Sequence, residues 1–428
     1  MTGYARMAAK LVSKQNAPQK HGLTRLRAYL RSLGNPQDSF KSVHVTGTNG
    51  KGSVCAMTAE ILRRSGCKTG LFISPHLADI RERIQIDGVP ISRARFAGLL
   101  KELERTAPFP LTFFETLACA AFLHFARERV DYAVIEVGIG GRLDATNTLH
   151  APEAAVITSI GLDHTVLLGG TVEKIAFEKA GIIKPGIPCV HGKLPAAALS
   201  VLRAKARACR SALRAPSGKN AFRPAGTDWD ALKLRIRNKK GERFQLNLLG
   251  AHQALNASVA AETADILREK GAPITAKAVR DAFAGVYWPG RFQVLRRGGK
   301  IVVLDGGHNP EAALFFSKAL SDSPLAGKKP VLVLGMLKDK DCRAIVSALR
   351  PHLSRVIATA PPSERALAPT ALAELVLRER PDAEIEVHGD CDTALRCGLA
   401  FPCCAVAGSF YLVGAALRLH SSAVKKPG

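Results

Sequence analysis

The chain has 428 residues, of which 47% are hydrophobic and 23% are charged, an ordinary composition for a globular protein. This length exceeds the size at which one hydrophobic core usually keeps growing, so we expect two domains. The apolar runs are too short or too interrupted by charge to span a bilayer, and no signal-peptide pattern opens the chain, which excludes a membrane-spanning protein and favours a cytoplasmic one.

The formal net charge of +25 is the abnormal feature of the composition. Much of it comes from residues 1–31, with seven basic and no acidic residues, and from residues 203–243, with thirteen basic and three acidic residues. Such a field can hold nucleic acid or concentrate small anions. No aromatic stacking pattern or known binding motif accompanies these charges. We therefore interpret them as a solvated basic face and expect no specific nucleic-acid partner.

Ten cysteines are scattered along the chain without a CxxC pair. Four of them cluster near the C-terminus, at Cys391, Cys397, Cys403 and Cys404. This cluster has neither the short pair spacing nor the nearby histidines of a zinc site. We expect reduced, structural thiols.

The N-terminal two-thirds of the chain alternate short apolar runs with segments of helix length. The predicted strands are Ser42–Thr46, Gly70–Ile73, Tyr132–Val137, Ala154–Ile160 and Ile187–His191. The predicted helices between them include Val54–Arg64, Phe113–Glu128 and Val172–Ala180. This alternation is typical of a mainly parallel sheet that is covered by helices on both faces.

A basic hairpin follows this series. Residues 232–237 alternate leucine or isoleucine with lysine or arginine, which predicts a strand with one face in solvent. Residues 238–241 predict the turn, and the chain then returns through Phe244, Leu246 and Leu248.

A second series of strands begins near Lys300. It comprises Ile301–Leu304, Val331–Leu334, Arg355–Thr359, Glu384–Val387 and Ala405–Ala407. Val286–Gly290 is the best linker between the two series, and we place the domain boundary near residue 293. The predicted fold class is α/β, with an N-terminal, mainly parallel-sheet domain over residues 1–292 and a smaller, Rossmann-like C-terminal domain over residues 293–428.

A glycine-rich turn, Thr46-Gly47-Thr48-Asn49-Gly50-Lys51-Gly52-Ser53, lies between the first predicted strand and the first predicted helix. Free backbone N–H groups and the helix dipole favour a phosphate at such a position. The turn departs from the usual G-x-x-x-x-G-K-[ST] pattern, because Val45 replaces the first glycine and Gly52 separates Lys51 from Ser53. We interpret it as a phosphate loop, in which Lys51 neutralises phosphate charge and Ser53 offers a hydroxyl to phosphate or Mg²⁺. A purely structural glycine turn is the alternative.

Two further polar side chains follow predicted strands. Glu136 closes an apolar strand, at the sheet edge where ligands of open α/β folds bind, and it suits a magnesium ligand. His164 closes the block Thr158–His164, and a neutral imidazole there can bind a metal. A lone histidine is more often packed or hydrogen-bonded, and spacing leaves both interpretations open.

Ten blocks occur in a fixed order along residues 20–415. They are Gly47–Ser53, Ser74–Leu77, Glu136–Asn147, Gly161–His164, Glu178–Gly181, His252-Gln253, Asn256-Ala257, Gly290–Phe292, Leu304–Pro310 and Gly408-Ser409. In this combination the chain resembles folylpolyglutamate synthase/dihydrofolate synthase, the folate branch of the Mur ligase superfamily. One departure is Gly307, where that family usually has alanine.

The resemblance implies an ATP-binding N-terminal domain and a role for each matching residue. The implied nucleotide-binding residues are Thr48, Asn49, Gly50, Lys51, Gly52, Ser53, Asn256, Arg291, Asp305 and His308. Asn256 would contact adenine and Arg291 the γ-phosphate, whereas Asp305 and His308 would contact the nucleotide or the incoming glutamate. The alternative for these residues is a structural role in turns and caps.

The resemblance also implies two Mg²⁺ ions and a modified lysine. Ser74 and Glu136 would hold one ion and His164 the other. Lys179 matches the lysine that is carbamylated in the family, which would turn a cation into a carboxylate beside the metal. An unmodified lysine paired with an acid is the alternative. The implied catalytic residues are Lys51, His164, Lys179 and Arg291.

The expected activity is ATP-dependent addition of L-glutamate to dihydropteroate or to the γ-carboxylate of folates, by a monomer, through an acyl phosphate. The partners are therefore ATP, L-glutamate and either folate or dihydropteroate. Three alternatives are a peptidoglycan-type Mur ligase, a nucleic-acid-stimulated NTPase and a non-catalytic binding paralogue. The residues leave the choice between dihydropteroate and reduced folates open.

Overall fold

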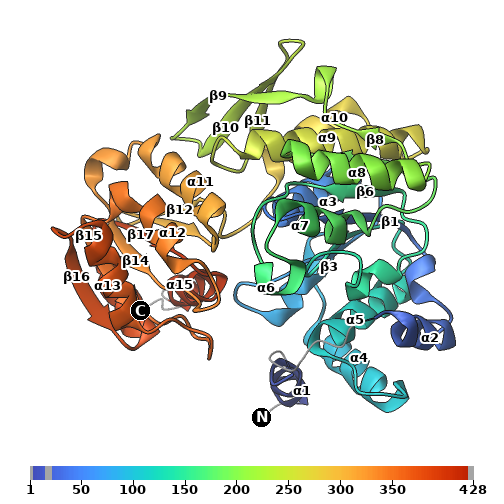
Figure 1. Ribbon diagram of the computed structural model, residues 1–428, viewed down its shortest axis with the longest axis horizontal. Helices are drawn as coiled ribbons and strands as arrows, with labels where there is room; N and C mark the ends of the chain where they lie inside the picture. Colours follow the sequence, from blue (N-terminus) through green and yellow to red (C-terminus); the bar gives the residue numbers. More distant parts are fainter. Residues whose placement is uncertain (1–2, 15–21, 423–428) are drawn as a thin grey trace.

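The N-terminal part of the chain is built on an eight-stranded sheet with the order β4-β3-β2-β5-β1-β6-β7-β8 (Figure 1). The computed structural model describes residues 3–14 and 22–422. From β2 to β8 neighbouring strands run parallel, and β3 and β4 form an antiparallel edge. The strands are β1 (Lys41–Thr46), β2 (Thr69–Phe72), β3 (Ile84–Ile86), β4 (Val89–Pro90), β5 (Tyr132–Glu136), β6 (Ala154–Ile157), β7 (Cys189–His191) and β8 (Leu213–Arg214).

Side-chain alternation along these strands supplies two buried faces. Val43 and Val45 face a core formed with the helices α3 (Lys51–Arg64), α9 (Gln253–Glu269) and α10 (Ala276–Gly285). The opposite face packs against further helices, and Ile135, for example, belongs to the core around α5. Helices on this side are α1 (Gly3–Val12), α2 (Thr24–Ser32), α4 (Arg93–Thr106), α5 (Phe113–Arg127), α7 (Val172–Ala180) and α8 (Ala196–Ala208). The predicted parallel sheet with helices on both faces is confirmed.

The register aligns the ends of the three central strands. Val45 is paired with Glu136 of β5, and Thr46 is paired with Ile157 of β6. The segments that follow β1, β5 and β6 therefore leave the sheet at one edge. This alignment brings the glycine-rich turn, Glu136 and the segment before His164 together.

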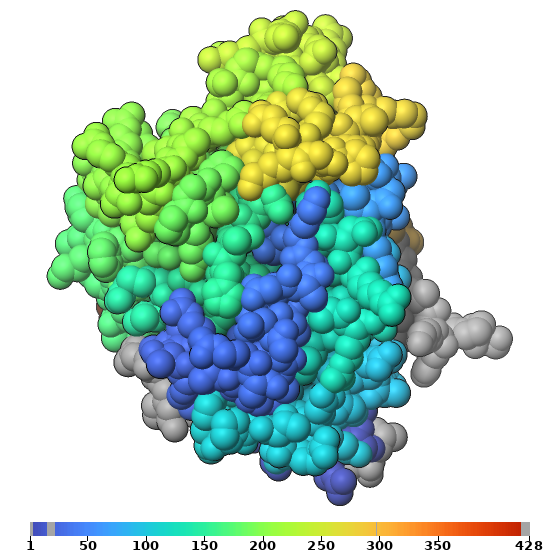
Figure 2. Space-filling view, turned by 90° about the vertical axis from the view of Figure 1, so that its right-hand side faces the viewer, coloured from blue at the N-terminus to red at the C-terminus, as the bar shows by residue number. Residues whose placement is uncertain are grey.

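A three-stranded antiparallel sheet confirms the predicted basic hairpin. It consists of β9 (Phe222–Asp228), β10 (Lys233–Asn238) and β11 (Arg243–Leu246), in the order β11-β10-β9. Leu234 and Ile236 are buried, whereas Arg235 and Arg237 are exposed. Figure 2 shows this yellow-green segment at the top of the molecule, next to the gold segment that contains α10.

The C-terminal part has a second, six-stranded sheet with the order β12-β13-β17-β14-β15-β16, in which only β12 is antiparallel to its neighbour. The strands are β12 (Gln293–Arg297), β13 (Lys300–Asp305), β14 (Val331–Leu334), β15 (Arg355–Thr359), β16 (Glu384–His388) and β17 (Cys403–Ala407). The helices α11 (Pro310–Ser321), α12 (Cys342–Ala348) and α13 (Pro369–Glu379) cover one face, and α14 (Cys391–Ala400) and α15 (Phe410–Ser422) cover the other. The predicted second α/β domain is thus confirmed.

Two predicted strands are shorter in the structure, and several elements were not predicted. The strand expected to reach residue 160 ends at Ile157, because Thr158 turns away and donates its hydroxyl to the Asn49 carbonyl at 2.6 Å. The strand expected from residue 187 begins at Cys189. The predicted linker 286–290 does lie between α10 and β12, and we retain residue 293 as the proposed boundary.

All ten cysteines are free thiols, as expected from their spacing. Among the helices within residues 3–14 and 22–422, none is long and apolar enough to cross a membrane.

Candidate active site

A cleft of about 1620 Å³ lies where the C-terminal edge of the first sheet meets the second domain. Its lining includes residues Thr48 to Ser53 of the glycine-rich turn, together with Glu136 and His164. Arg291, which directly follows the linker 286–290, lines the same cleft together with Asp305 and His308 of the second domain. Predicted site residues that are far apart in the sequence thus converge in space.

The glycine-rich turn has the geometry of a phosphate loop. Gly50 adopts a left-handed conformation with φ of 82°, and α3 begins at the next residue, Lys51. The Lys51 ammonium folds over the loop and donates to the carbonyls of Gly47 at 2.9 Å and Thr48 at 3.3 Å. A positive helix N-terminus and an ammonium group therefore share one small volume, which suits an anionic ligand.

Ser74 and Glu136 come together as predicted, from the ends of the neighbouring strands β2 and β5. The Ser74 backbone N–H donates to Glu136 Oε2 at 2.9 Å. Burial raises the pKa of Glu136, and the nearby Lys51 and the Ser74 N–H oppose that rise. Both residues line the cleft. A carboxylate and a serine hydroxyl are hard oxygen donors of the kind that Mg²⁺ prefers, so these residue types fit the predicted ion.

His164 lies in the segment after β6, at the start of the short helix α6 (Thr165–Leu168). Its own backbone N–H donates to Asp163 Oδ1 at 2.8 Å. Burial, and then the nearby Lys340 ammonium, lower the pKa of His164 to about 4, so the imidazole is neutral near pH 7. A neutral imidazole is able to bind a metal. Within the described part of the chain, however, no three His, Cys, Asp or Glu side chains converge on one point, so each predicted ion would need ligands from substrate or water.

Lys179 lies in the last turn of α7 and is 4% exposed. Its Nζ donates to the Gly47 carbonyl at 2.8 Å. Burial, followed by repulsion from Lys51, lowers the pKa of Lys179 to about 7. The carboxylates of Asp163 and Asp144 oppose this lowering of the pKa of Lys179, so the alternative of a lysine paired with an acid stays open. Lys179, His164 and residues of the phosphate loop line a small cavity of about 10 Å³.

Arg291 and Asp305, which flank the strand pair at the start of the second domain, have different contacts. The Arg291 guanidinium lies 4.3 Å from the centroid of the Phe410 ring, and burial lowers its pKa. Asp305 uses both carboxylate oxygens locally, accepting the backbone N–H of Phe292 at 2.8 Å and of Gly307 at 2.7 Å. Asp305 therefore shapes the loop that carries Arg291, as its turn alternative predicts, and its contact with nucleotide or glutamate stays a prediction.

Gly307, which departs from the family pattern, sits in a tight place. A methyl group at this position would lie 2.8 Å from Asp305 Oδ1 and 3.0 Å from Ala312 Cβ. Glycine thus leaves room for the short hydrogen bond between Asp305 and the Gly307 N–H.

Asn256, predicted to contact adenine, projects from α9 against the phosphate loop. Its Nδ2 donates to Gln253 Oε1 at 2.9 Å, and its Oδ1 lies 2.4 Å from the point where a Cβ on Gly50 would be. His308 is close to the Phe410 ring, with 5.1 Å between centroids, and its Nδ1 lies 3.2 Å from the Gly306 carbonyl oxygen.

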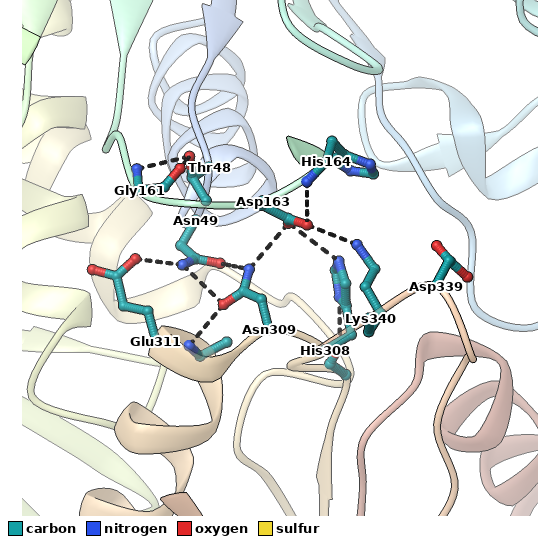
Figure 3. A network of polar contacts seen from close by, with 12 residues as sticks. Thr48, Asn49, Gly161, Asp163, His164, His308, Asn309, Glu311, Asp339 and Lys340 are labelled. Carbon is teal, nitrogen blue, oxygen red and sulfur yellow. Dashed lines mark hydrogen bonds and ion pairs between the residues drawn. The ribbon is translucent and has the colours of Figure 1, made fainter. Parts of the chain in front are cut away.

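The structure adds residues that the sequence did not single out. Lys340 forms an ion pair with Asp163 at 2.8 Å, and Asn309 contacts both Asn49 and Asp163 (Figure 3). Lys340 occurs in the charged run 338–341, which carries no sequence signal of a buried group. Asn309 lies within the block Leu304–Pro310, in which the resemblance implies roles for Asp305 and His308 only.

Comparisons with known proteins show which family the chain resembles. Residues 45–264 match the family model of the Mur ligase middle domain, and residues 290–408 match that of the Mur ligase, glutamate ligase domain. The dihydrofolate synthase/folylpolyglutamate synthase of Bacillus subtilis is 35% identical over 346 residues, which cover 77% of this chain and 79% of the relative. A probable bifunctional folylpolyglutamate synthase/dihydropteroate synthase of Haloferax volcanii is 35% identical over 95% of this chain, which spans about half of that relative (49%).

Solved structures show the same likeness. Mycobacterium tuberculosis folylpolyglutamate synthase complexed with ADP has a TM-score of 0.86 and 30% identity, covering 100% of this chain and 99% of that one. Escherichia coli FolC in complex with DHPP and ADP has a TM-score of 0.84 and 28% identity, with 98% of each chain covered. A Yersinia pestis bifunctional folylpolyglutamate synthase/dihydrofolate synthase complexed with AMPPNP and Mn ion has a TM-score of 0.82 and 28% identity, again with 98% of each chain covered.

Proposed function

The chain belongs to the Mur ligase family, in its folylpolyglutamate synthase/dihydrofolate synthase branch, and from this membership we propose that it is an ATP-dependent glutamate ligase. The acceptor is the carboxylate of dihydropteroate, the γ-carboxylate of a folate, or both. The observation that carries the proposal is the convergence of Lys51, Glu136 and Lys179 on the phosphate loop, with Arg291 lining the cleft beside Lys51 and Glu136. We further propose that the protein acts as a monomer in the cytoplasm, without a nucleic-acid partner.

The residues support a reaction in two steps. A carboxylate is unreactive toward an amine near neutral pH, so its oxygen first attacks the γ-phosphate of ATP to give an acyl phosphate and ADP. The amine of L-glutamate then attacks the acyl carbon, phosphate leaves, and the amine loses a proton as the amide forms. In this reaction Lys51 and Arg291 would offset the negative charge on the transferred group.

Ser74 and Glu136 would hold one Mg²⁺, and His164 would contribute to a second. When bound, these ions would neutralise phosphate charge and orient the nucleotide. The buried Glu136 carboxylate is available for this purpose because only its Oε2 is used by the Ser74 N–H among the described hydrogen bonds.

We also propose that Lys179 is carbamylated. Its pKa of about 7 leaves much of the amine neutral near pH 7, and only a neutral amine attacks carbon dioxide. The N–C bond forms, one amine proton is released, and the product is a carbamate anion near His164. In bicarbonate, Lys179→Ala should lose turnover and Lys179→Glu should retain more than Lys179→Arg. An active Lys179→Arg protein would contradict the carbamate and leave the ligase assignment standing.

Product analysis tests the reaction itself. ADP release is measured with ATP, L-glutamate and either dihydropteroate or tetrahydrofolate, and the product is identified by its mass. A mass increase of one glutamate residue, matched by ADP, is the expected result. ADP release with a UDP-muramoyl substrate alone would favour a peptidoglycan-type ligase, stimulation only by DNA or RNA would favour an NTPase, and no turnover would favour a binding paralogue.

A further inference from the structure

A cluster of polar side chains joins the phosphate loop to the second domain (Figure 3). It consists of Asn49, Asp163, Asn309, Glu311 and Lys340, and we call it the interdomain latch. Asn49 lies in the phosphate loop and Asp163 in the segment after β6. Asn309 and Glu311 lie at the start of α11, and Lys340 lies in the loop that follows β14.

The side-chain amide of Asn49 is hydrogen-bonded to the second domain through both its nitrogen and its oxygen. Its Nδ2 donates to Glu311 Oε2 at 2.6 Å and to Asn309 Oδ1 at 3.3 Å. Its Oδ1 accepts from Asn309 Nδ2 at 2.9 Å. The Asn49 backbone N–H donates to Ser159 Oγ at 2.9 Å, so the residue is held on both sides. The Asn49 side chain thus ties the phosphate loop to the second domain, and its contact with nucleotide stays a prediction.

Asp163 forms the other half of the latch. Its Oδ1 accepts from Lys340 Nζ at 2.8 Å, and its Oδ2 accepts from Asn309 Nδ2 at 3.2 Å. The Lys340 and Asp163 side chains are only 8% and 10% exposed. Because Asp163 also accepts the backbone N–H of His164, the second domain is connected to both predicted ligand-binding segments. Buried polar groups of this kind are stable when all are paired and unfavourable when one partner leaves.

We propose that the interdomain latch positions the phosphate loop and the His164 segment only when the second domain is docked, so that phosphoryl transfer is coupled to a closed cleft. This inference rests on the proposed ligase function. An acyl phosphate is consumed by water unless the amine reaches it first, and a closed cleft excludes water. Asn309 is the central member because its amide contacts Asn49 and Asp163 together. Asn309, Glu311 and Lys340 are positioning residues, since they act through Asn49 and Asp163.

Two variants each remove a hydrogen bond of the interdomain latch to Asp163, one at Asn309 and the other at Lys340. Asn309 also caps α11, where its Oδ1 accepts the Ala312 N–H at 2.9 Å. Asn309→Asp keeps that cap, because aspartate and asparagine cap helices equally well, but it removes the donor and places a carboxylate against Asp163. Lys340→Met keeps the apolar stem and removes the charge. Lys338→Met is the matched control, because Lys338 is exposed on the same loop and does not line the cleft.

The experiment measures ADP and glutamylated product in the same reaction, with thermal unfolding as the folding check. The parent and Lys338→Met should form ADP and amide in equal amounts. In Asn309→Asp and Lys340→Met, ADP should exceed amide, and kcat/KM for amide formation should fall by about tenfold, within the range of coupling between linked sites. Lys340→Arg should recover most of the coupling.

Three results would overturn the inference. If both variants form ADP and amide in equal amounts, with the same kcat/KM as the parent, the interdomain latch has no effect on catalysis. A slower reaction that still yields equal ADP and amide would show a structural role without coupling. A parent that forms no glutamylated product would instead overturn the proposed function, and this inference with it. If one variant fails to fold, the other variant still tests the inference.

Discussion

Replacing Lys179 by methionine should abolish turnover and yet stabilise the unmodified protein. Burial and Lys51 lower the pKa of Lys179 from 10.5 to about 7. A shift of one pKa unit corresponds to about 1.4 kcal/mol. At pH 7 the buried amine therefore lowers the free energy of unfolding by about 5 kcal/mol as an upper bound. Losing the hydrogen bond to Gly47 offsets about 1 kcal/mol. We expect Lys179→Met to raise the free energy of unfolding by about 2–4 kcal/mol.

The pH dependence of this gain has a definite sign. Because the folded-state pKa of Lys179 is lower than the unfolded value, the unfavourable contribution of the lysine is absent above about pH 10.5. It grows as the pH falls and is complete below pH 7. The stability difference between Lys179→Met and the parent should therefore be constant below pH 7 and shrink toward alkaline pH.

The assay is urea unfolding of both proteins at a series of pH values, in buffers free of bicarbonate and metal. The product assay on the same preparations supplies the turnover. Added bicarbonate should narrow the difference in unfolding free energy between the two proteins, because carbamylation converts the Lys179 amine of the parent into a carbamate. A methionine variant that is less stable than the parent at pH 7, or a difference that does not change with pH, would refute the burial argument.

Three substitutions test the nucleotide site. Lys51→Ala should leave the protein folded and reduce kcat by about 10²–10³-fold, because a charge partner of the transition state is lost; near-parental turnover at saturating ATP would contradict the phosphate loop. Glu136→Gln keeps shape and should raise the Mg²⁺ concentration needed for half-maximal rate by at least about tenfold, so an unchanged magnesium titration would count against the metal role. In Gly50→Ala, the new methyl group would lie 2.4 Å from Asn256 Oδ1, and alanine would have to adopt the left-handed backbone conformation of Gly50. We expect a higher KM for ATP, and an unchanged KM would contradict the assignment of Asn256 to the adenine site.

The central sheet and the phosphate loop were predictable because their signals are local. Apolar runs bounded by glycine or polar residues predicted β1, β5 and β14 to within a residue. Parallel strands place their C-terminal ends at one edge, so Glu136 and the loop could be expected to meet. By contrast β9 was not predicted, because Pro224 and Gly226 interrupt its apolar pattern, and β12 was not predicted although it pairs with β13.

The partners of individual side chains in the site were not predictable, because they come from distant segments. Asn49 and Asn309 are 260 residues apart, and Asp163 and Lys340 are 177 apart. A family pattern can assign such residues to the site, but it cannot distinguish an asparagine that binds nucleotide from one that binds the other domain. Asp305 is a similar case, since two backbone N–H groups occupy its carboxylate.

The unusual glycine in the phosphate loop has an explanation in the same terms. A Cβ on Gly52 would lie 3.0 Å from the Trp288 ring, and Trp288 belongs to the linker between the domains. The linker therefore rests on the first turn of α3, where a larger side chain would push it away. Together with Asn49, this contact gives the phosphate loop two attachments to segments beyond the first sheet.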